Sequence, residues 1–326
     1  MLRILEASLK AVVVESHGGP EQLLVKEIAE PQPKANEIKI RLRAAGVNFI
    51  DIYHREGVYP LALPTVLGNE GAGEVIEVGE EVTEFSVGDR VAYTGVLGSF
   101  AEHAVVPALR AVKIPNEVSF DQAAAAMLQG MTAQFLADSC FPLKEHQIAV
   151  IHAAAGGVGS LLTQLASHKH HATVVATTST PEKAAQATRN GATHSIDYDH
   201  FADLVHELGG ADVVYDGVGQ ATFDRSLASL KPRGMLVLYG AASGQVPPFD
   251  LQRLNQAGSV YVTRPSLVHY IATRQELLAR ATTLFADIAS GMLRVDIGGR
   301  YPLDSVGQAQ LDLASRNTTG KLIITI

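Results

Sequence analysis

The glycine-rich residues 154 to 159 have the spacing of a phosphate-binding turn. In the segment IHAAAGGVGSLLTQLA, residues 151 to 166, three glycines separate an apolar run from a run with helical spacing. A glycine turn from a strand into a helix brings backbone N–H groups and a helix N-terminus to a phosphate. Against the dinucleotide-binding pattern G-x-G-x-x-G, Ala154 replaces the first glycine, which is tolerated if its φ is negative. Close packing of a strand on a helix is the alternative interpretation.

Hydroxyl side chains and one ammonium stand where an NAD-selective protein carries an acid. An Asp or Glu about 20 residues beyond the glycines usually binds the ribose 2′-OH of NAD. Here the next predicted strand ends in Thr177, Thr178 and Ser179, and Lys183 follows. Neutral hydroxyls beside a positive charge suit the 2′-phosphate of NADPH. We therefore expect NADPH as the cofactor, and an exposed helix lysine is the alternative interpretation of Lys183.

A parallel sheet would position these residues, and the chain predicts one from about residue 143. Strand patterns at 148–153, 173–178, 193–197, 212–219 and 235–240 alternate with helical patterns. This alternation indicates a parallel sheet with helices on both faces. The glycine turn is then the first strand-to-helix connection, which is the context in which the pattern predicts a bound dinucleotide.

A mostly β region precedes this sheet. Residues 11 to 115 hold short β-branched runs separated by Gly, Pro, Asn and Asp, which is typical of strands and turns. The last section, from about residue 266, holds a long helical pattern and the strand KLIITI, too little for a further domain. We predict an α/β fold in which a Rossmann-type doubly wound parallel sheet (132–267) is inserted in a mostly β domain (1–131 and 268–326). Residues 1–9 are predicted to be a short extension.

Composition argues against several other classes of protein. The chain has 326 residues, 47% of them hydrophobic, and a formal net charge of -8. No general basic field is present for a polyanion, so we expect no nucleic-acid partner. Cys140 is the one cysteine, which rules out an intrachain disulfide and fits a cytoplasmic location. No signal peptide and no apolar run of about 18 residues is found, so we expect no membrane span.

Seven motifs occur in an order that resembles a known family. They are HGGPEQL, GVNFID, GNEGAG, VGDRV, AAAGGVG, VYDGVG and VYVTRPSL. Together they resemble the zinc-independent quinone oxidoreductases related to zeta-crystallin, within the medium-chain dehydrogenase/reductase superfamily. The resemblance covers nearly all of residues 11 to 326. It implies a GroES-like catalytic domain, a Rossmann domain that binds NADPH, a small-molecule quinone or enone substrate, and a homodimer.

The two positions that bind catalytic zinc in related alcohol dehydrogenases carry amides here. Asn48 replaces the cysteine of the "GVC" turn, and Asn69 replaces the histidine of "GHE". An amide is a poor zinc ligand beside thiolate and imidazole, so we expect no metal. His168, His170 and His171 cluster in SHKHHA, but their position favours a solvated helix end over a metal site.

The resemblance also implies individual site residues. Asn48 and Tyr53 are the predicted catalytic residues, with Tyr53 as a donor to a developing oxyanion. The alternatives are a turn residue that bonds its own backbone for Asn48 and a core tyrosine with a satisfied hydroxyl for Tyr53. Thr132 is expected at the start of a helix, where an ordinary N-cap is the alternative. The predicted cofactor-binding residues are Asn48, Thr132, Ala155, Gly156, Gly157, Val158, Gly159, Ser179, Lys183, Tyr198, Tyr239, Gly240, Ala241, Arg264 and Arg316. By the resemblance, Ser179, Lys183 and Tyr198 are expected at the adenosine 2′-phosphate, and residues 239–241 in the loop under the nicotinamide.

Two other functions stay open at this stage. Related reductases with the same motifs act on activated alkenes, and the choice between quinone and enone depends on the shape of the cleft, which no motif reports. A crystallin-like or RNA-binding protein that retains NADPH is the second alternative. The acidic balance and the lack of a basic, aromatic-interleaved run argue against RNA binding.

Overall fold

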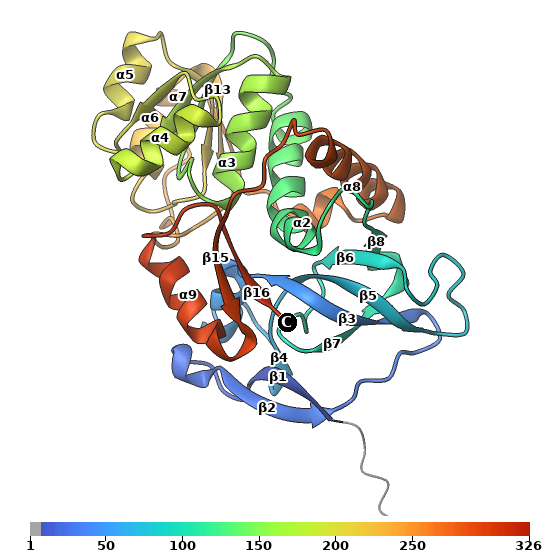
Figure 1. Cartoon of the computed structure of the whole chain (residues 1–326). Helices are drawn as coiled ribbons and strands as arrows, with labels where there is room; N and C mark the ends of the chain where they lie inside the picture. The colour runs from blue at the N-terminus through green and yellow to red at the C-terminus, as the bar shows by residue number, and fades with distance from the viewer. Residues whose placement is uncertain (1–7) are drawn as a thin grey trace, which may run out of the picture. The chain divides into compact units, whose positions relative to one another are not determined.

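The computed structural model describes residues 8–326 and divides them into two compact units (Figure 1). Unit 1 contains the described residues up to Leu128, Thr273–Ala289 and Ile297–Ile326, and unit 2 contains Gln129–Ala272 and Ser290–Asp296. The domain limits expected from the sequence, at 131/132 and 267/268, stay a proposal. The division in the structure lies a few residues away from both, and it also assigns Ser290–Asp296 to unit 2.

The larger sheet of unit 1 joins strands from both ends of the chain. Its strand order is β15-β16-β3-β5-β6-β8, and β7 also pairs with β3. The strands are β3 (Glu37–Gly46), β5 (Glu70–Val78), β6 (Arg90–Thr94), β7 (His103–Pro107), β8 (Ala111–Lys113), β15 (Ile297–Pro302) and β16 (Lys321–Thr325). β16 pairs antiparallel with β3, with Ile323 opposite Gly46. Continued by two residues, this register brings Lys321 level with Asn48.

A smaller sheet of unit 1 has the order β2-β1-β4. It consists of β1 (Ser8–Val14), β2 (Leu24–Ala29) and β4 (Thr65–Val66). Of the predicted extension 1–9, residues 1–7 lie outside the described residues, and Ser8 and Leu9 already belong to β1. Unit 1 also holds α1 (Phe49–Glu56), α8 (Arg274–Ala289), α9 (Val306–Ser315) and 3₁₀ turns at Pro20–Gln22, Ala108–Arg110 and Leu303–Ser305.

The sheet of unit 2 is parallel throughout. Its strands are β9 (Ile148–Ile151), β10 (Thr173–Thr177), β11 (His194–Ile196), β12 (Ala211–Asp216), β13 (Leu230–Leu238) and β14 (Tyr261–Thr263). They lie in the order β11-β10-β9-β12-β13-β14, which is the 3-2-1-4-5-6 order of a doubly wound dinucleotide-binding sheet. The predicted fold class is confirmed. In such sheets, ligands bind outside the carboxyl ends of the strands where the order reverses, here β9 and β12.

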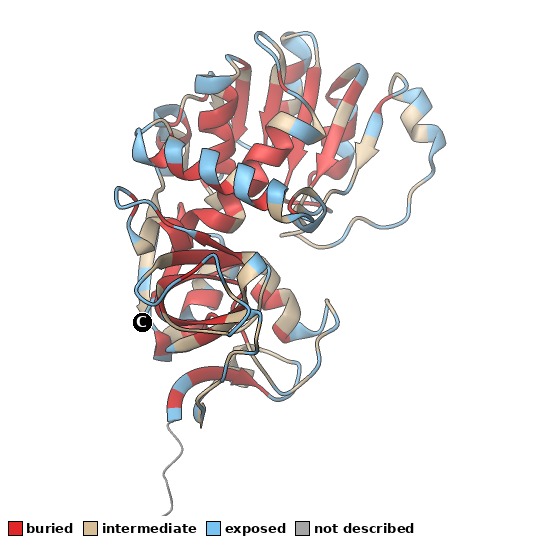
Figure 2. Ribbon diagram, turned by 90° about the vertical axis from the view of Figure 1, so that its right-hand side faces the viewer, coloured by how far each residue is buried: buried red, intermediate tan, exposed pale blue. Residues whose placement is uncertain are grey.

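Helices cover the sheet of unit 2, and its strands form the core. The helices are α3 (Gly157–Gln164), α4 (Pro181–Arg189), α5 (Phe201–Glu207), α6 (Phe223–Ala228) and α7 (Gln252–Gln256), with a π turn at Leu165–Lys169 and a 3₁₀ turn at Leu267–Tyr270. Every residue of β12 is buried, and Figure 2 shows the same for most of the sheet. Within residues 8–326, no helix is long and apolar enough to cross a membrane.

Helix α2 (Phe120–Phe135) corrects one prediction. The sequence analysis placed Thr132 at the start of a helix, but the residue is buried near the end of α2, which continues into a π turn at Leu136–Cys140. The helix begins after Ser119, whose hydroxyl accepts the N–H of Gln122 while the Gln122 side chain accepts the N–H of Ser119. This reciprocal capping box fixes the true start, so Thr132 is not an N-cap.

Candidate cofactor and catalytic sites

The glycine turn forms at the carboxyl end of β9, as predicted. Gly156 is the N-cap of α3, which begins at Gly157. A Cβ on Gly159 would lie 2.8 Å from the Cα of Ala154 and closer still to the carbonyl oxygen of Ala153. Only glycine allows α3 to approach the strand so closely. Ala154 has no positive φ; Ala153 has one, at 51°, so alanine at position 154 is compatible with the turn.

Gly156 has a different environment from Gly159. A Cβ at Gly156 would meet one atom within 4 Å outside its chain neighbours, the Ala153 carbonyl oxygen at 3.2 Å. The protein therefore leaves the space over Gly156 open, at the N-terminus of a helix that begins at a carboxyl strand end. A phosphate needs such close access to the backbone. The residues present fit the pyrophosphate of a dinucleotide.

Hydroxyl and ammonium groups meet at the carboxyl end of β10. Lys183 Nζ donates a hydrogen bond to Ser179 Oγ over 3.3 Å. Thr180 caps α4 and accepts the backbone N–H of Lys183, which fixes the start of the helix that carries the lysine. Tyr198 Oη accepts the N–H of Ala153 over 3.0 Å, which connects the loop after β11 to the glycine turn. The predicted 2′-phosphate residues thus gather at adjoining strand ends.

The predicted nicotinamide loop lies at the ends of β12 and β13. A Cβ on Gly240 would lie 2.8 Å from the Cα of Gly217, so the two backbones are in direct contact. Tyr239 lies against Gly217, and desolvation, with Asp216 nearby, raises the pKa of its hydroxyl. Arg264 Nη1 donates to the carbonyl oxygen of Leu238 over 3.1 Å. Ala241 follows Gly240 in the same loop.

Unit 1 contains a buried polar cluster around Asn48. Asn48 Nδ2 donates to Glu70 Oε2 over 3.1 Å and to the Gly46 carbonyl oxygen over 3.2 Å. Lys321 Nζ donates to Asn48 Oδ1 over 2.6 Å and to Glu70 Oε2 over 2.8 Å. Glu70 Oε1 accepts the N–H of Leu128 over 2.6 Å. We name Asn48, Asp51, Glu70 and Lys321 the Asn48 cluster; none is more than 5% exposed.

The Asn48 cluster determines what the Asn48 side chain offers. Both amide hydrogens of Asn48 have partners within unit 1, so the group that remains is its oxygen, which already accepts from Lys321. Asn48 also caps α1, where its backbone N–H donates to Asp51 Oδ2 over 2.8 Å. The ammonium of Lys321 lies beside the amide that replaces the zinc-binding cysteine. These residues do not fit a zinc ion.

Within residues 8–326, Asp51 contributes a buried oxygen atom without a partner to the Asn48 cluster. Within the described chain, its Oδ1 is buried without a hydrogen-bond partner. Burial raises the pKa of Asp51 to about 7, with Glu70 adding to the effect and the Asn48 N–H and Lys321 opposing it. A neutral carboxyl is therefore favoured in the native state across mildly acidic pH.

We expect Asp51 to make the protein less stable as the pH rises. Between its usual pKa of 3.8 and about 7, the unfolded chain releases this proton and the native chain keeps it. The free energy of unfolding then falls with pH, by up to about 3 kcal/mol from pH 5 to pH 8. Asp51→Asn should reduce that fall. Urea unfolding of both proteins at the two pH values measures the difference, and equal slopes would contradict the assignment.

Tyr53 lies in a group of aromatic side chains on α1 and the loop that follows. Its ring packs edge-on to Tyr59, with centroids 5.4 Å apart, and 6.3 Å from Phe49. His54 is 6.2 Å from Tyr59, and burial lowers the pKa of its imidazole. Tyr53 is half-buried, in contrast to a core tyrosine such as Tyr93, which is fully buried.

The predicted site residues are divided between the two units. Asn48, Tyr53 and Arg316 belong to unit 1, and all other predicted site residues, Thr132 included, belong to unit 2. Arg316 is exposed and ends α9 with a φ of 57°. His168, His170 and His171 lie at the end of the helical segment that the glycine turn begins. Within residues 8–326, no group of three His, Cys, Asp or Glu side chains could hold a metal ion.

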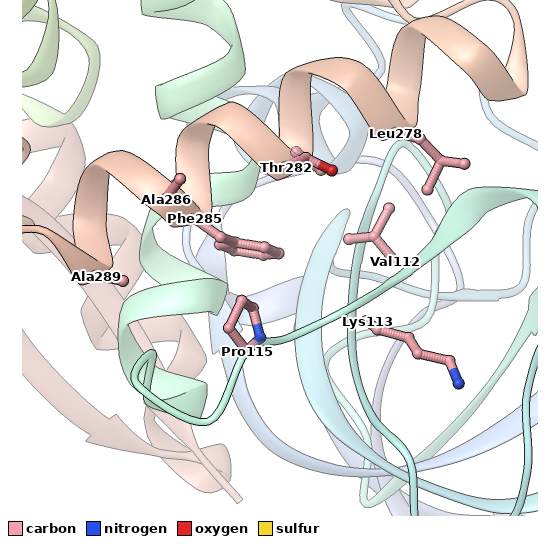
Figure 3. A pocket seen from close by; sticks show the side chains of 9 residues that line it. Val112, Lys113, Pro115, Leu278, Thr282, Phe285, Ala286 and Ala289 are labelled. Carbon is pink, nitrogen blue, oxygen red and sulfur yellow. The ribbon is translucent and has the colours of Figure 1, made fainter.

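A separate apolar pocket in unit 1 contains none of the predicted site residues. Its volume is about 280 Å³, and it lies between β8 and α8 (Figure 3). Pro115 and Phe285 approach each other in it, and Leu278 and Val112 line another part. Lys113, at its edge, forms an ion pair with Asp89 over 2.8 Å. The pocket offers no convergent polar groups for chemistry.

Sequence analysis missed two sets of buried polar residues. Glu70 and Lys321 belong to the Asn48 cluster, and His152 and Asp216 form a network beneath the glycine turn. Each of the four residues lies at or next to a strand end and is at most 3% exposed. The sequence signal that could have identified these buried residues is a charged or imidazole side chain directly beside an apolar strand.

Two segments of the chain match known protein families. Residues 34–116 match an alcohol dehydrogenase GroES-like domain, and residues 157–284 match a zinc-binding dehydrogenase. A GroES-like unit, a doubly wound parallel sheet and a glycine turn at the first connection of that sheet define a medium-chain dehydrogenase/reductase.

Individual relatives narrow this class. The chain is 44% identical to quinone oxidoreductase of Pseudomonas aeruginosa, over 97% of this chain and 99% of the relative. It is 38% identical to 2-haloacrylate reductase of a Burkholderia species, over 96% and 98%. The chain belongs to the quinone oxidoreductase family, which confirms the resemblance inferred from its motifs.

Solved structures agree with this assignment. Quinone oxidoreductase of Pseudomonas syringae pv. tomato matches with a TM-score of 0.95 and 46% identity, over 98% of this chain and all of the other. Escherichia coli quinone oxidoreductase complexed with NADPH matches with a TM-score of 0.94 and 39% identity, over 97% and 100%.

Proposed function

We propose that the protein is an NADPH:quinone oxidoreductase that works without a metal ion. The observation that carries this proposal is the glycine turn with its open Gly156, together with the Lys183–Ser179 pair at the next strand end. The quinone oxidoreductase relatives, one of them complexed with NADPH, support the same cofactor and substrate class. Activity with NADPH and a soluble quinone, at a rate well above that with NADH, tests it.

Different groups of residues are proposed to bind different parts of NADPH. NADPH, when bound, supplies the hydride, so the protein must hold and orient it rather than react itself. Ala155, Gly156, Gly157, Val158 and Gly159 offer backbone N–H groups to the pyrophosphate. Ser179, Lys183 and Tyr198 bind the 2′-phosphate, and Tyr239, Gly240, Ala241 and Arg264 hold the nicotinamide end. We keep Asn48, Thr132 and Arg316 as further cofactor contacts.

Tyr53 is proposed as a donor to the oxyanion that develops on the acceptor. Tyr53→Phe should slow enone reduction by about 10- to 100-fold. This is less than the roughly 100- to 1,000-fold (about 2.7 to 4 kcal/mol) of an optimally placed oxyanion donor, because a phenol on a half-buried ring is less well placed. Quinone reduction should slow less, because a quinone is already strongly electrophilic. Tyr59→Phe is the matched control, because Tyr59 packs against Tyr53 in the same aromatic group. Equal losses in both variants would assign Tyr53 a packing role only.

An activated alkene is the second candidate acceptor. The similarity to 2-haloacrylate reductase favours this class. A panel of soluble 1,4-quinones and α,β-unsaturated ketones at equal concentrations, with NADPH in excess, ranks the two by kcat/KM. A clear preference for the alkenes would replace quinone reduction as the main activity and leave the cofactor assignment in place.

Metal removal should leave activity unchanged. The amides at positions 48 and 69 and the ammonium of Lys321 beside Asn48 are poor surroundings for a cation. Dialysis against a strong chelator, followed by metal analysis and a quinone assay, is expected to give a metal-free protein with full kcat. Loss of activity that returns with one equivalent of zinc would overturn the metal-free mechanism.

We also propose a homodimer in the cytoplasm. β14 is an edge strand of the unit 2 sheet, and its Tyr261 is 59% exposed. An exposed strand edge that carries a large aromatic side chain is a surface that another chain commonly covers. The cytoplasmic location rests on Cys140, a free thiol in a protein with no other cysteine. Sedimentation of the purified protein measures the oligomeric state.

A further inference from the structure

A chain of buried hydrogen bonds runs beneath the glycine turn, from Asp216 to Thr177. Ser226 Oγ donates to Asp216 Oδ2 over 3.0 Å. The His152 ring lies 2.8 Å from Ser226 Oγ through Nε2 and 2.8 Å from Thr177 Oγ1 through Nδ1. Asp216 Oδ1 accepts the N–H groups of Val218 and Gly219, over 2.8 and 2.9 Å. We name His152, Thr177, Asp216 and Ser226 the His152 network; all four are fully buried.

The chemistry of these groups fixes where each proton lies. A carboxylate only accepts hydrogen bonds, so the Ser226 hydroxyl donates to Asp216 and must accept from His152. The ring hydrogen of His152 is therefore on Nε2, and Nδ1 accepts the hydroxyl hydrogen of Thr177. Burial lowers the pKa of His152, with Asp216 opposing, so the ring is neutral. The His152 network thus holds the ring in one tautomer and one orientation.

The ring that is held in this way supports Tyr198. The two rings are stacked, with centroids 5.8 Å apart and an angle of 27° between their planes. Phe201 packs edge-on to the His152 ring at 4.8 Å. Tyr198 Oη in turn accepts the N–H of Ala153, the residue with a φ of 51° that follows His152. A displacement of the His152 ring would therefore displace the phenol of Tyr198.

We infer that His152 is a positioning residue for the choice of NADPH over NADH. Its hydrogen-bonded ring holds Tyr198 where the phenol hydroxyl contacts the 2′-phosphate. This inference rests on the role proposed above for Tyr198. It extends that role to the fully buried residues of the His152 network, and it assigns a function to the buried carboxyl group of Asp216. The carboxylate fixes the tautomer of His152 through Ser226.

The effect falls on one part of the cofactor. Backbone N–H groups of the glycine turn serve the pyrophosphate, which NADPH and NADH share. The 2′-phosphate is present in NADPH alone. Loosening Tyr198 should therefore weaken NADPH binding and spare NADH, whereas general damage to the turn would weaken both cofactors equally.

Two conservative variants test the inference. Ser226→Ala removes the acceptor for His152 Nε2, and Thr177→Val removes the donor to Nδ1 with little change of shape. Each should lower NADPH affinity by about 10-fold, the lower end for loss of one hydrogen bond to a charged group, with NADH affinity within about 2-fold of wild type. Thr163→Val is the matched control, since Thr163 is equally buried in unit 2 and lies outside the His152 network. Titration calorimetry with each cofactor gives the ratios.

A second readout reports on the imidazole itself. In protein labelled with ¹⁵N-histidine, the His152 signal, assigned with His152→Gln, should show the neutral Nε2–H tautomer in the wild type and lose it in Ser226→Ala. Equal weakening of both cofactors, unchanged NADPH affinity, or an Nδ1–H tautomer in the wild type would overturn the inference. Tyr198→Phe distinguishes failure of this inference from failure of the proposed function. Normal NADPH affinity in that variant would overturn the inference, whereas NADPH binding and quinone reduction by the wild type would still support the proposed function.

Discussion

Replacement of Lys183 by alanine is expected to weaken NADPH binding by roughly 10- to 150-fold and to leave NADH binding nearly unchanged. The range follows from about 1.5 to 3 kcal/mol for a hydrogen bond to a charged group. The ammonium of Lys183 is already directed to Ser179 Oγ, so little rearrangement precedes its contact with a 2′-phosphate. NADH lacks that phosphate, so the affinity for NADH should not depend on Lys183.

Ser179→Asp should lower the affinity for NADPH relative to NADH more than Lys183→Ala does. A carboxylate at this exposed strand end repels the 2′-phosphate and can accept from the 2′-OH of NADH. The measurement is the ratio of the two dissociation constants across wild type and both variants. Lys144→Ala, which removes an exposed lysine of unit 2, is the matched control for the loss of charge alone. Equal affinity of the wild type for both cofactors would contradict the assignment of NADPH. Weaker binding of both cofactors by Lys183→Ala would also contradict it.

The cofactor half of the site could be predicted because its signals are local. The alternation of strands and helices fixes a parallel sheet, and Gly159 is required by contacts with Ala153 and Ala154, only a few residues away. The position of Ser179 and Lys183 follows from the same counting along the chain, since both flank the start of α4. Backbone geometry over a short range is what a sequence pattern encodes most directly.

The Asn48 cluster could not be predicted in the same way. Lys321 and Glu70 are 251 positions apart, and they meet because β16 pairs with β3 in one particular register. No pattern in KLIITI reveals that register. His152 and Ser226 are likewise 74 positions apart. Thr132 is a different case, because the capping box in SFDQ at residues 119–122 was visible and would have placed the helix start correctly.

Breaking the buried pair of Glu70 and Lys321 should strongly destabilise the protein. Lys321→Met leaves the Glu70 carboxylate buried without its cation, at a cost of about 3 to 5 kcal/mol in the free energy of unfolding. Glu70 is fully buried and closely packed against Gly46, where an added Cβ would collide with Glu70 Oε2. Water therefore has little access to the carboxylate.

The double variant Glu70→Gln/Lys321→Met separates the charge from the packing. It removes both charges and keeps an oxygen for the N–H of Leu128, so we expect it to recover at least half of the loss. Lys26→Met is the matched control, because the Lys26–Glu15 pair has side chains 40% and 52% exposed and should contribute about 1 kcal/mol or less. Urea unfolding of the four proteins gives the comparison. If Lys321→Met cost no more than Lys26→Met, the buried ammonium would have no electrostatic partner of consequence, and the Asn48 amide would need another support.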